Sequence, residues 1–385
     1  MAFISIGFLG GRFFQKIMDP LPAKLDADLK ASKKKLENLA ENSQSELQNS
    51  KTQTQNARKQ IRELKGRLTR YENIRERLLS DEIDLWGVAP PEPPQGFQDR
   101  LKNSRTKIIA IANLKGGVGK TTLASNLIAY MEQEAKKRVL AIDLDYQGSL
   151  SSALIQAAGL DFSGSTVDDF LSGARCGEDI PLVAKSLNPA MPDASILTSA
   201  YQLAQLENKL MLRWLLGEVD GDIRYNLGQA LVSDEVQNAF DIVIIDCPPR
   251  LTTAGINAIC AAHQLIVPTV PDSMSSEAVG RFANQIKSLK GNLNPELKFA
   301  GVVLNLAQQR DLKPHEEAAV SAIRQDLLRQ GLEPHIFKRH IPRTASVAGV
   351  AGTDVAYLRN ANFRTGVMKQ LGDEVAARVW FEEAA

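Results

Sequence analysis

One glycine-rich stretch, residues 114–122, constrains this chain more than any other. It reads Leu-Lys-Gly-Gly-Val-Gly-Lys-Thr-Thr, with an apolar run over residues 108–112 before it and a helix-compatible run over 123–131 after it. This order predicts a strand, a glycine loop and a helix. Backbone N–H groups in such a loop, at the positive end of a helix dipole, bind phosphate oxygens. The pattern therefore predicts a phosphate-binding loop, and a plain glycine turn is the simpler structural alternative.

The residue types in the loop suit phosphate chemistry. Glycines permit unusual dihedrals and a close approach of the backbone, the lysine reaches the β- and γ-phosphates, and the first threonine hydroxyl can hold Mg²⁺. Leu114 stands where the ordinary spacing has a glycine, five positions before Gly119. We expect the nucleotide to be bound by Gly116, Gly117, Val118, Gly119, Lys120, Thr121 and Thr122.

The run Lys-Gly-Gly-Val-Gly-Lys-Thr-Thr resembles the deviant Walker A motif of the ParA/MinD class of P-loop ATPases. The resemblance implies ATP and Mg²⁺ as cofactors, ATP hydrolysis, and a homodimer that forms with ATP. In this class the early lysine, Lys115 here, crosses the dimer interface and contacts phosphate bound by the partner. Lys115 and Lys120 are therefore expected to be catalytic.

A second motif follows an apolar run over residues 139–142, in the sequence Asp-Leu-Asp-Tyr-Gln-Gly-Ser. Carboxylates at the carboxyl end of a parallel strand lie where ligands bind in open α/β sheets. One acid is placed to order Mg²⁺ or its waters and the other to orient an attacking water. The motif is similar to the class's Asp-x-Asp-Pro-Gln-Gly element, with Tyr146 in place of proline, and this implies that Asp145 is the hydrolytic residue.

A third motif is the strand over residues 241–245, which ends in Asp246-Cys-Pro-Pro. Asp246 resembles the Walker B acid, which acts on Mg²⁺ through water. The expected metal-binding residues are thus Thr121, Asp143 and Asp246, and Asn305 and Pro342 resemble the positions that flank the adenine.

The rest of the chain after residue 106 alternates strands and helices. Further strands are expected near 195–197, 265–268, 299–305 and 336–342, and helices over 200–216, 276–289, 313–329 and 354–371. Such alternation predicts an α/β fold of the P-loop NTPase kind, a mostly parallel twisted sheet with helices on both faces.

The first hundred residues form a separate region. We predict an apolar segment over 1–20, a helical or coiled-coil extension over 21–86, a Pro-rich linker over 87–105, and the ParA-like ATPase domain over 106–385. The apolar segment suits a membrane-surface helix, a partner-docking segment or packing on the protein's own core. A 4-3 apolar spacing is convincing only over residues 57–71.

Cysteine content and hydropathy favour a cytoplasmic protein. Cys176, Cys247 and Cys260 show no metal or disulfide spacing, which fits a reducing compartment. A metal-cluster reductase on the same fold would need a convincing cysteine pair. No apolar run approaches the ~20 residues of a membrane span.

Two functional hypotheses follow from the resemblance. In the first, an ATP-dependent dimer binds nonspecific DNA, drives partitioning or positioning of a cargo, and is stimulated by a ParB-like activator protein. The basic candidates for DNA contact are Arg281, Lys287, Lys290, Arg310, Lys338, Arg339 and Arg343. In the second, the nucleotide switch acts in a protein or membrane-associated assembly through the N-terminal extension, without DNA.

Local charge bears on both hypotheses. Residues 58–77 hold eight basic and three acidic side chains, which suits a phosphate backbone or a solvated coiled-coil flank. The C-terminal residues 379–385 are short and acidic, which argues against the membrane-binding amphipathic helix of MinD-type proteins, so a membrane partner is not favoured.

Overall fold

The computed structural model describes residues 20–78, 86, 91–162, 164–307, 312–343, 349 and 352–380. The chain divides into two compact units, Met1–Glu72 and Asn73–Ala385. The apolar segment predicted over residues 1–20 lies outside the described residues except for Pro20, where the first helix begins.

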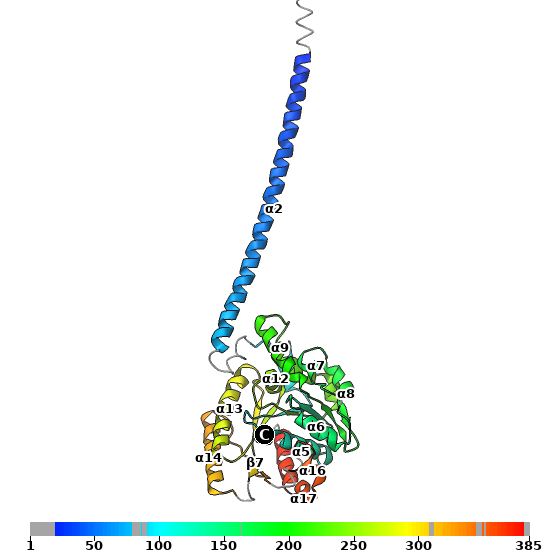
Figure 1. The fold of residues 1–385 in the computed structure, drawn as a ribbon, viewed down its shortest axis with the longest axis vertical. Helices are drawn as coiled ribbons and strands as arrows, with labels where there is room; N and C mark the ends of the chain where they lie inside the picture. The colour runs from blue at the N-terminus through cyan, green and yellow to red at the C-terminus, as the bar shows by residue number, and fades with distance from the viewer. Residues whose placement is uncertain are drawn as a thin grey trace, which may run out of the picture. The chain divides into compact units, whose positions relative to one another are not determined.

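The first unit is described by one long helix, α2 (Pro20–Leu78), which continues into the first residues of the second unit (Figure 1). Beyond its first turn the helix contains no proline and a single glycine, Gly66, and it is rich in the strong helix formers Lys, Glu, Gln, Leu and Ala. Its described side chains up to Asn73 are exposed or, at Arg70, half-exposed. The predicted helical extension is therefore confirmed.

The second unit, which we call the body, is built on an eight-stranded sheet. All neighbouring strands are parallel except the edge strand β3, which pairs antiparallel with β4. The strand order is β3 (Lys185–Leu187), β4 (Met191–Leu197), β2 (Val139–Asp143), β5 (Ile242–Asp246), β1 (Lys107–Ile111), β6 (Gln264–Thr269), β7 (Lys298–Ala307) and β8 (Ile341–Pro342). This confirms the predicted mostly parallel sheet.

Both faces of the sheet are buried. Along β1, Ile109 and Ile111 belong to one apolar cluster, and Ile108 and Ala110 belong to the other. A strand covered on both faces needs apolar residues, which explains the unbroken apolar run from Ile108 to Ile111.

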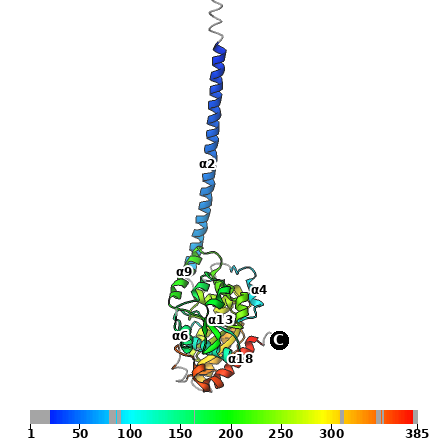
Figure 2. The same ribbon diagram turned by 90° about the vertical axis from the view of Figure 1, so that its right-hand side faces the viewer.

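Helices from different parts of the sequence cover the two faces (Figures 1 and 2). One cluster draws on α5 (Lys120–Gln133), α6 (Ser149–Ala157), α16 (Ala356–Arg359) and α18 (Lys369–Trp380). The other cluster draws on α9 (Gln202–Leu216), α10 (Asn226–Leu231), α12 (Thr253–Ala261), α13 (Ser273–Asn292) and α14 (Pro314–Arg329).

Three predicted elements differ in the structure. The helix expected over 354–371 is divided into α16, α17 (Ala361–Phe363), a π-helical turn (Arg364–Met368) and α18, because the Asn360 side chain caps a new start by accepting a hydrogen bond from Phe363 N. The strand expected over 336–342 is reduced to β8 and an isolated bridge between Ile336 and Val302. Helix α13 begins three residues before its predicted start, because Asp272 caps it.

Part of the predicted Pro-rich linker packs into the body. Helix α4 (Phe97–Lys102) contributes Phe97 and Leu101, both fully buried. Trp86, the last residue of the predicted helical extension, also packs into the body and is 2% exposed. The Trp86 indole donates a hydrogen bond to Leu251 O at 2.8 Å, and its ring stacks on Trp214 with centroids 6.0 Å apart. The apolar core thus begins upstream of residue 106.

A search of the described helices for one both long enough and apolar enough to cross a bilayer finds none.

Candidate active site

The three sequence motifs meet at one edge of the sheet. In the strand register Ile111 lies beside Asp246, and Asp246 lies beside Asp143. The phosphate loop follows directly after β1. The carboxyl ends of β1, β5 and β2 therefore bring the loop and both carboxylates together, where open α/β sheets bind ligands.

At two positions the loop has a backbone conformation that strongly favours glycine. Gly117 has a φ of 73° and Gly119 a φ of 84°, both in the left-handed region. A Cβ atom on Gly119 would lie 1.9 Å from Asn305 Nδ2. Conformation and space therefore both require glycine at position 119.

Asn305 holds the loop from β7. Its Nδ2 atom donates to Val118 O at 3.0 Å and to Gly119 O at 3.1 Å, and its side chain is fully buried. Its Oδ1 atom accepts from Leu306 N at 3.1 Å. The predicted adenine contact of Asn305 stays a prediction. The next residue, Leu306, has a φ of 57°, an uncommon conformation for a leucine. Pro342 is half-buried in β8, where it pairs with Ala307.

The two lysines of the loop have different surroundings. Lys120 is 7% exposed and its Nζ atom donates to Lys115 O at 3.2 Å. Burial lowers the pKa of Lys120, against the opposing effect of Asp246 and Asp145. Lys115 is more open, with 30% of its side chain exposed. Its ammonium donates to Ser275 Oγ at 2.7 Å and lies 3.5 Å from Asp272 Oδ1.

Thr121 and Asp246 form the contact expected of a magnesium site. The Thr121 hydroxyl donates to Asp246 Oδ2 at 2.6 Å. Asp246 Oδ1 is buried and has no hydrogen-bond partner among the residues that the structure describes. Burial, and next the charge of Asp143, raise the pKa of Asp246 well above its usual range. A buried carboxylate with an unpartnered oxygen is a suitable ligand for a hard cation.

Asp143 is fully buried and its oxygens organise the following loop. Oδ2 accepts from Ser151 N at 2.8 Å and Ser151 Oγ at 2.7 Å, and Oδ1 accepts from Asp145 N at 3.1 Å. Burial raises the pKa of Asp143 to about 6. The carboxylate lies beside the predicted metal site, and its direct contacts are with the protein.

Asp145 is more accessible than the other two acids. It is half-buried, and its Oδ1 atom accepts a hydrogen bond from Gln147 N at 3.0 Å. The chain then turns at Gly148, where φ is 64° and a Cβ would lie 2.9 Å from Ser199 O. Asp145 therefore has the access that an acid acting on water needs.

Within the described residues, no group of three or more His, Cys, Asp and Glu side chains gathers as a metal-binding cluster. Mg²⁺ usually takes only one or two protein carboxylates together with waters and substrate phosphates. The Thr121 hydroxyl and the Asp246 carboxylate fit that requirement. The three cysteines are free, and two of them are buried.

Sequence analysis missed the residues that hold Lys115. Asp272 caps α13 by accepting from Ser275 N at 2.7 Å, and both side chains face the lysine. Asn113 accepts from Lys115 N at 3.0 Å and donates to Pro268 O at 2.8 Å. The Asp-x-x-Ser spacing after β6 indicates a helix cap. That the capping residues also contact Lys115 depends on tertiary structure and cannot be seen in this spacing.

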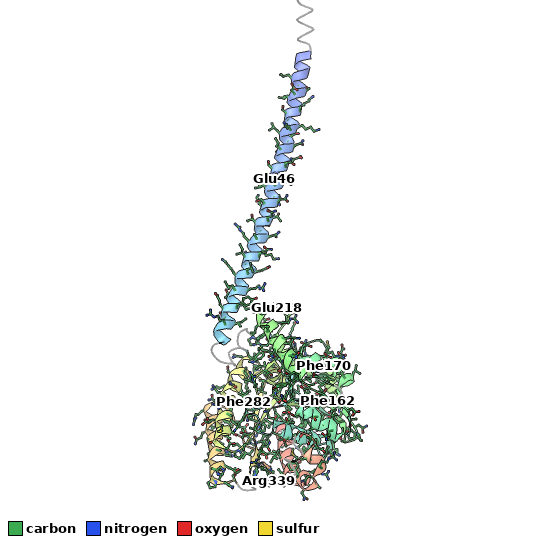
Figure 3. The ribbon with its side chains drawn as sticks, viewed as in Figure 1. Glu46, Phe162, Phe170, Glu218, Phe282 and Arg339 are labelled. Atoms are coloured by element: carbon green, nitrogen blue, oxygen red, sulfur yellow. The ribbon has the colours of Figure 1, made fainter. Side chains whose placement is uncertain are left out.

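The basic candidates for DNA contact lie on the body. Arg281 and Lys287 are exposed on α13, Lys290 is half-buried in its last turn, and Arg310 lies outside the described residues. Lys338, Arg339 and Arg343 are exposed around β8, and Figure 3 labels Arg339 at the periphery of the body.

The chain matches a known protein family and is similar in sequence to known proteins. A family model described as an AAA domain matches residues 106–299. The chromosome partitioning protein ParA of Caulobacter vibrioides is 32% identical over 205 residues, which are 53% of this chain and 71% of that protein.

This chain belongs to the ParA-like P-loop ATPases. Among solved structures, apo McdA from Cyanothece shares the ParA-like fold, with a TM-score of 0.57 and 22% identity over 71% of this chain and 99% of that one. The cobyrinic acid a,c-diamide synthase of Mycobacterium smegmatis, solved with ADP and magnesium, has a TM-score of 0.51 and 28% identity over 68% of this chain and 96% of that one.

Proposed function

We propose that this protein is a Mg²⁺-dependent ATPase that closes as an ATP-bound homodimer and moves or positions a cargo by binding nonspecific DNA. The observation that carries the proposal is the meeting of the phosphate loop, Lys115 and the Thr121–Asp246 pair at one sheet edge. The ParA relative is a chromosome partitioning protein, and the diamide synthase binds ADP and magnesium. Both support the proposal.

The loop would bind the phosphates of ATP with its backbone N–H groups and with Lys120. The Lys120 ammonium is buried beside the loop, so its charge acts with little screening by water. Thr121 and Asp246 would hold Mg²⁺, which neutralises phosphate charge when it is bound. Asn305 keeps the loop in place from β7. Most of the catalytic effect would then come from positioning and charge.

Asp145 would orient the attacking water. It is half-buried at the carboxyl end of β2, and the hydrogen bonds through Asp143 fix the loop that carries it. Its loss should slow hydrolysis more than it weakens ATP binding, because the carboxylate acts on water rather than on the nucleotide.

Lys115 would couple ATP binding to dimer closure. In the structure its ammonium contacts Ser275 and Asp272 of the same chain. To contact phosphate in a second subunit, the side chain must leave these partners. ATP phosphates offer a stronger negative charge than one partly exposed carboxylate, which would favour that exchange.

The test is fluorescence anisotropy of a DNA duplex with ATP, with ADP and without nucleotide. Wild type is compared with Lys120→Ala and Asp145→Ala, and exposed Lys209→Ala and Asp220→Ala serve as matched controls. We expect salt-sensitive binding only with ATP, prolonged in Asp145→Ala, lost in Lys120→Ala and unchanged in both controls. ATP-dependent dimers that bind no DNA would refute the DNA part of the proposal.

A second candidate function is a nucleotide switch that acts in a protein assembly through the N-terminal extension. The long exposed helix α2 favours it. Deletion of residues 1–72 separates the two, because the DNA-based function requires that the body alone retains ATP-dependent DNA binding.

A further inference from the structure

Between Leu25 and Tyr71, the large apolar side chains of α2 lie on a single line along the helix. In the first unit, the large apolar side chains whose exposure is described are all exposed, between 36% and 73%. They are Leu25, Leu29, Leu36, Leu39, Leu47, Ile61, Leu64, Leu68 and Tyr71. Nothing in the described part of their own unit covers them.

These side chains follow a coiled-coil repeat. Steps of four and three residues connect these side chains when five intervening positions are included, four of them small polar residues and the fifth Ala57. The one irregularity in this series is a pair of successive four-residue steps on either side of Ser43. We call this line the seam; its positions are 25, 29, 32, 36, 39, 43, 47, 50, 54, 57, 61, 64, 68 and 71. The average step is about 3.5 residues, the repeat of a left-handed coiled coil.

The irregularity explains why the sequence showed only part of the seam. A strict seven-residue repeat drawn back from residues 57–71 passes through Ala40 and Leu29 but misses Leu25 and Leu39. Two successive steps of four form a stutter, which locally unwinds the coil without ending it. With the stutter, the seam extends over almost the whole described first unit.

We propose that α2 pairs with α2 of a second copy of this chain, as a parallel, in-register, two-stranded coiled coil. A seam of this length would be about 70 Å long at 1.5 Å per residue. It would cover the exposed leucines of both helices. A single helix has no reason to keep a 3.5-residue apolar repeat, because its own turn is 3.6 residues.

The charges beside the seam are complementary in a parallel pair of copies. Two seam positions that are three residues apart form a seam pair. In a parallel coil, the residue just before such a pair contacts the residue five positions later in the partner helix. Three of these contacts join opposite charges: Asp28 with Lys33, Glu46 with Lys51, and Arg67 with Glu72. Figure 3 shows Glu46 on the helix.

The remaining flanking contacts are neutral on one side. They are Lys35 with Ala40, Gln53 with Arg58, and Gln60 with Lys65. No contact in the parallel register joins like charges, although residues 58–77 have an excess of basic residues. The sequence therefore accommodates its own copy without repulsion.

The coil has a consequence for the body. Two parallel helices end together, so the two bodies would be tethered at the same end of the coil. Closure of the bodies with ATP would then be an intramolecular step, at the high effective concentration of a tether. This consequence rests on the proposed function, whereas the pairing of α2 does not.

Orientation is tested by cysteine cross-linking of the full chain without nucleotide. In a Cys176→Ser, Lys120→Ala background, Ser32→Cys and Ser50→Cys place a thiol at two separate seam positions, and Thr52→Cys places one on the opposite face. A parallel register predicts cross-linked dimers for each seam cysteine and none for Thr52→Cys. An antiparallel pair can cross-link at most one of the two seam positions, and that outcome overturns the proposal.

Association is tested by light scattering after size-exclusion chromatography. Wild type without nucleotide should be a dimer, Leu64→Lys with Leu68→Lys should be a monomer, and Thr52→Lys with Thr69→Lys should remain a dimer. A monomeric wild type, or seam variants that stay dimeric without nucleotide, would disprove the coil. ATP-dependent dimers of the seam variant would still support the proposed function, so the two failures are distinguishable.

Discussion

Ile244 and Ile61 are the same residue type in opposite surroundings. Ile244 lies in β5 and is fully buried, whereas Ile61 lies in α2 and is 53% exposed. The body buries its apolar residues between its sheet and its helices, whereas α2 has no such cover in the described part of its own unit. One region is stabilised within the chain, and the other displays a regular apolar line that a partner can cover.

The glycines make the same contrast. Gly119 has a positive φ and no room for a Cβ, whereas Gly66 in α2 has nothing within 4 Å of a Cβ. In the body a glycine is required by the conformation and packing of the loop, and in α2 it only weakens a helix. Matched substitutions in the two regions can therefore test the comparison.

The largest effect is expected from Gly119→Ala. The added Cβ would collide with the Asn305 side chain and impose strain at a positive φ, so the loop or the Asn305 amide that holds it must move. ATP turnover should fall by at least about 10²-fold, and stability by about 1–3 kcal/mol. Steady-state ATPase assays and urea unfolding measure both. Gly291→Ala, in a helix with open space, is the control, and full activity of Gly119→Ala would contradict the loop geometry.

Substituting the two isoleucines should separate the regions. Ile244→Ala should lower the free energy of unfolding of the body by about 2–5 kcal/mol, independent of protein concentration. Ile61→Ala should leave body unfolding within about 0.5 kcal/mol and weaken the α2 dimer. Denaturation followed at two protein concentrations gives both results. A concentration-independent loss of body stability in Ile61→Ala would break the comparison.

Gly66→Ala should stabilise α2 by about 1 kcal/mol, because alanine is the better helix former and the site has room for a methyl group. The position faces away from the seam, so the effect should be on helicity rather than on contacts. Thermal melting followed by circular dichroism measures it. A lower melting temperature would show that the backbone at residue 66 is not helical in solution.

The smallest effect is expected from Glu207→Gln in the body. Burial raises the pKa of Glu207, whose Oε1 accepts from Ala254 N at 2.8 Å. A raised pKa means that the folded state binds the proton more tightly, so stability is lost as pH rises through the interval above the ordinary value of 4.5. Glutamine keeps the acceptor without the charge.

Glu207→Gln should therefore stabilise the body at pH 7.5 by no more than about 1 kcal/mol, with no gain below the ordinary glutamate pKa. Urea unfolding midpoints of wild type and Glu207→Gln, measured at pH 7.5 and at a pH below the ordinary glutamate pKa, give the gain in stability at each pH. An equal gain at both would mean that charge is not the cause.

The parts of the body that could be predicted from sequence are those whose structure depends on neighbouring residues in the chain. Strand β5 is an unbroken β-branched run, and the loop carries its glycines and Gly-Lys-Thr in a spacing that phosphate requires. The placement of Asn305 under the loop, nearly two hundred residues away, depends on which strands are neighbours. No local pattern encodes that, and the same holds for the contacts of Lys115 with Asp272 and Ser275.

In the N-terminal region, composition predicted one element and concealed another. The helix was predictable from composition, whereas the burial of Trp86 and Phe97 was hidden by the neighbouring prolines, which are typical of a linker. A tryptophan that lies between two sequence regions gives no periodic signal. Only the folded body shows that it belongs to the core.

The fluorescence of Trp86 can report on movements near the candidate active site. Its indole is bonded to the carbonyl of Leu251, five residues beyond Asp246, and is stacked on Trp214. Indole emission depends on ring stacking and on hydrogen bonding of the N–H group. A displacement of the loop after β5 on ATP binding would therefore change the intrinsic fluorescence of the chain, and stopped-flow mixing could time it without any attached dye.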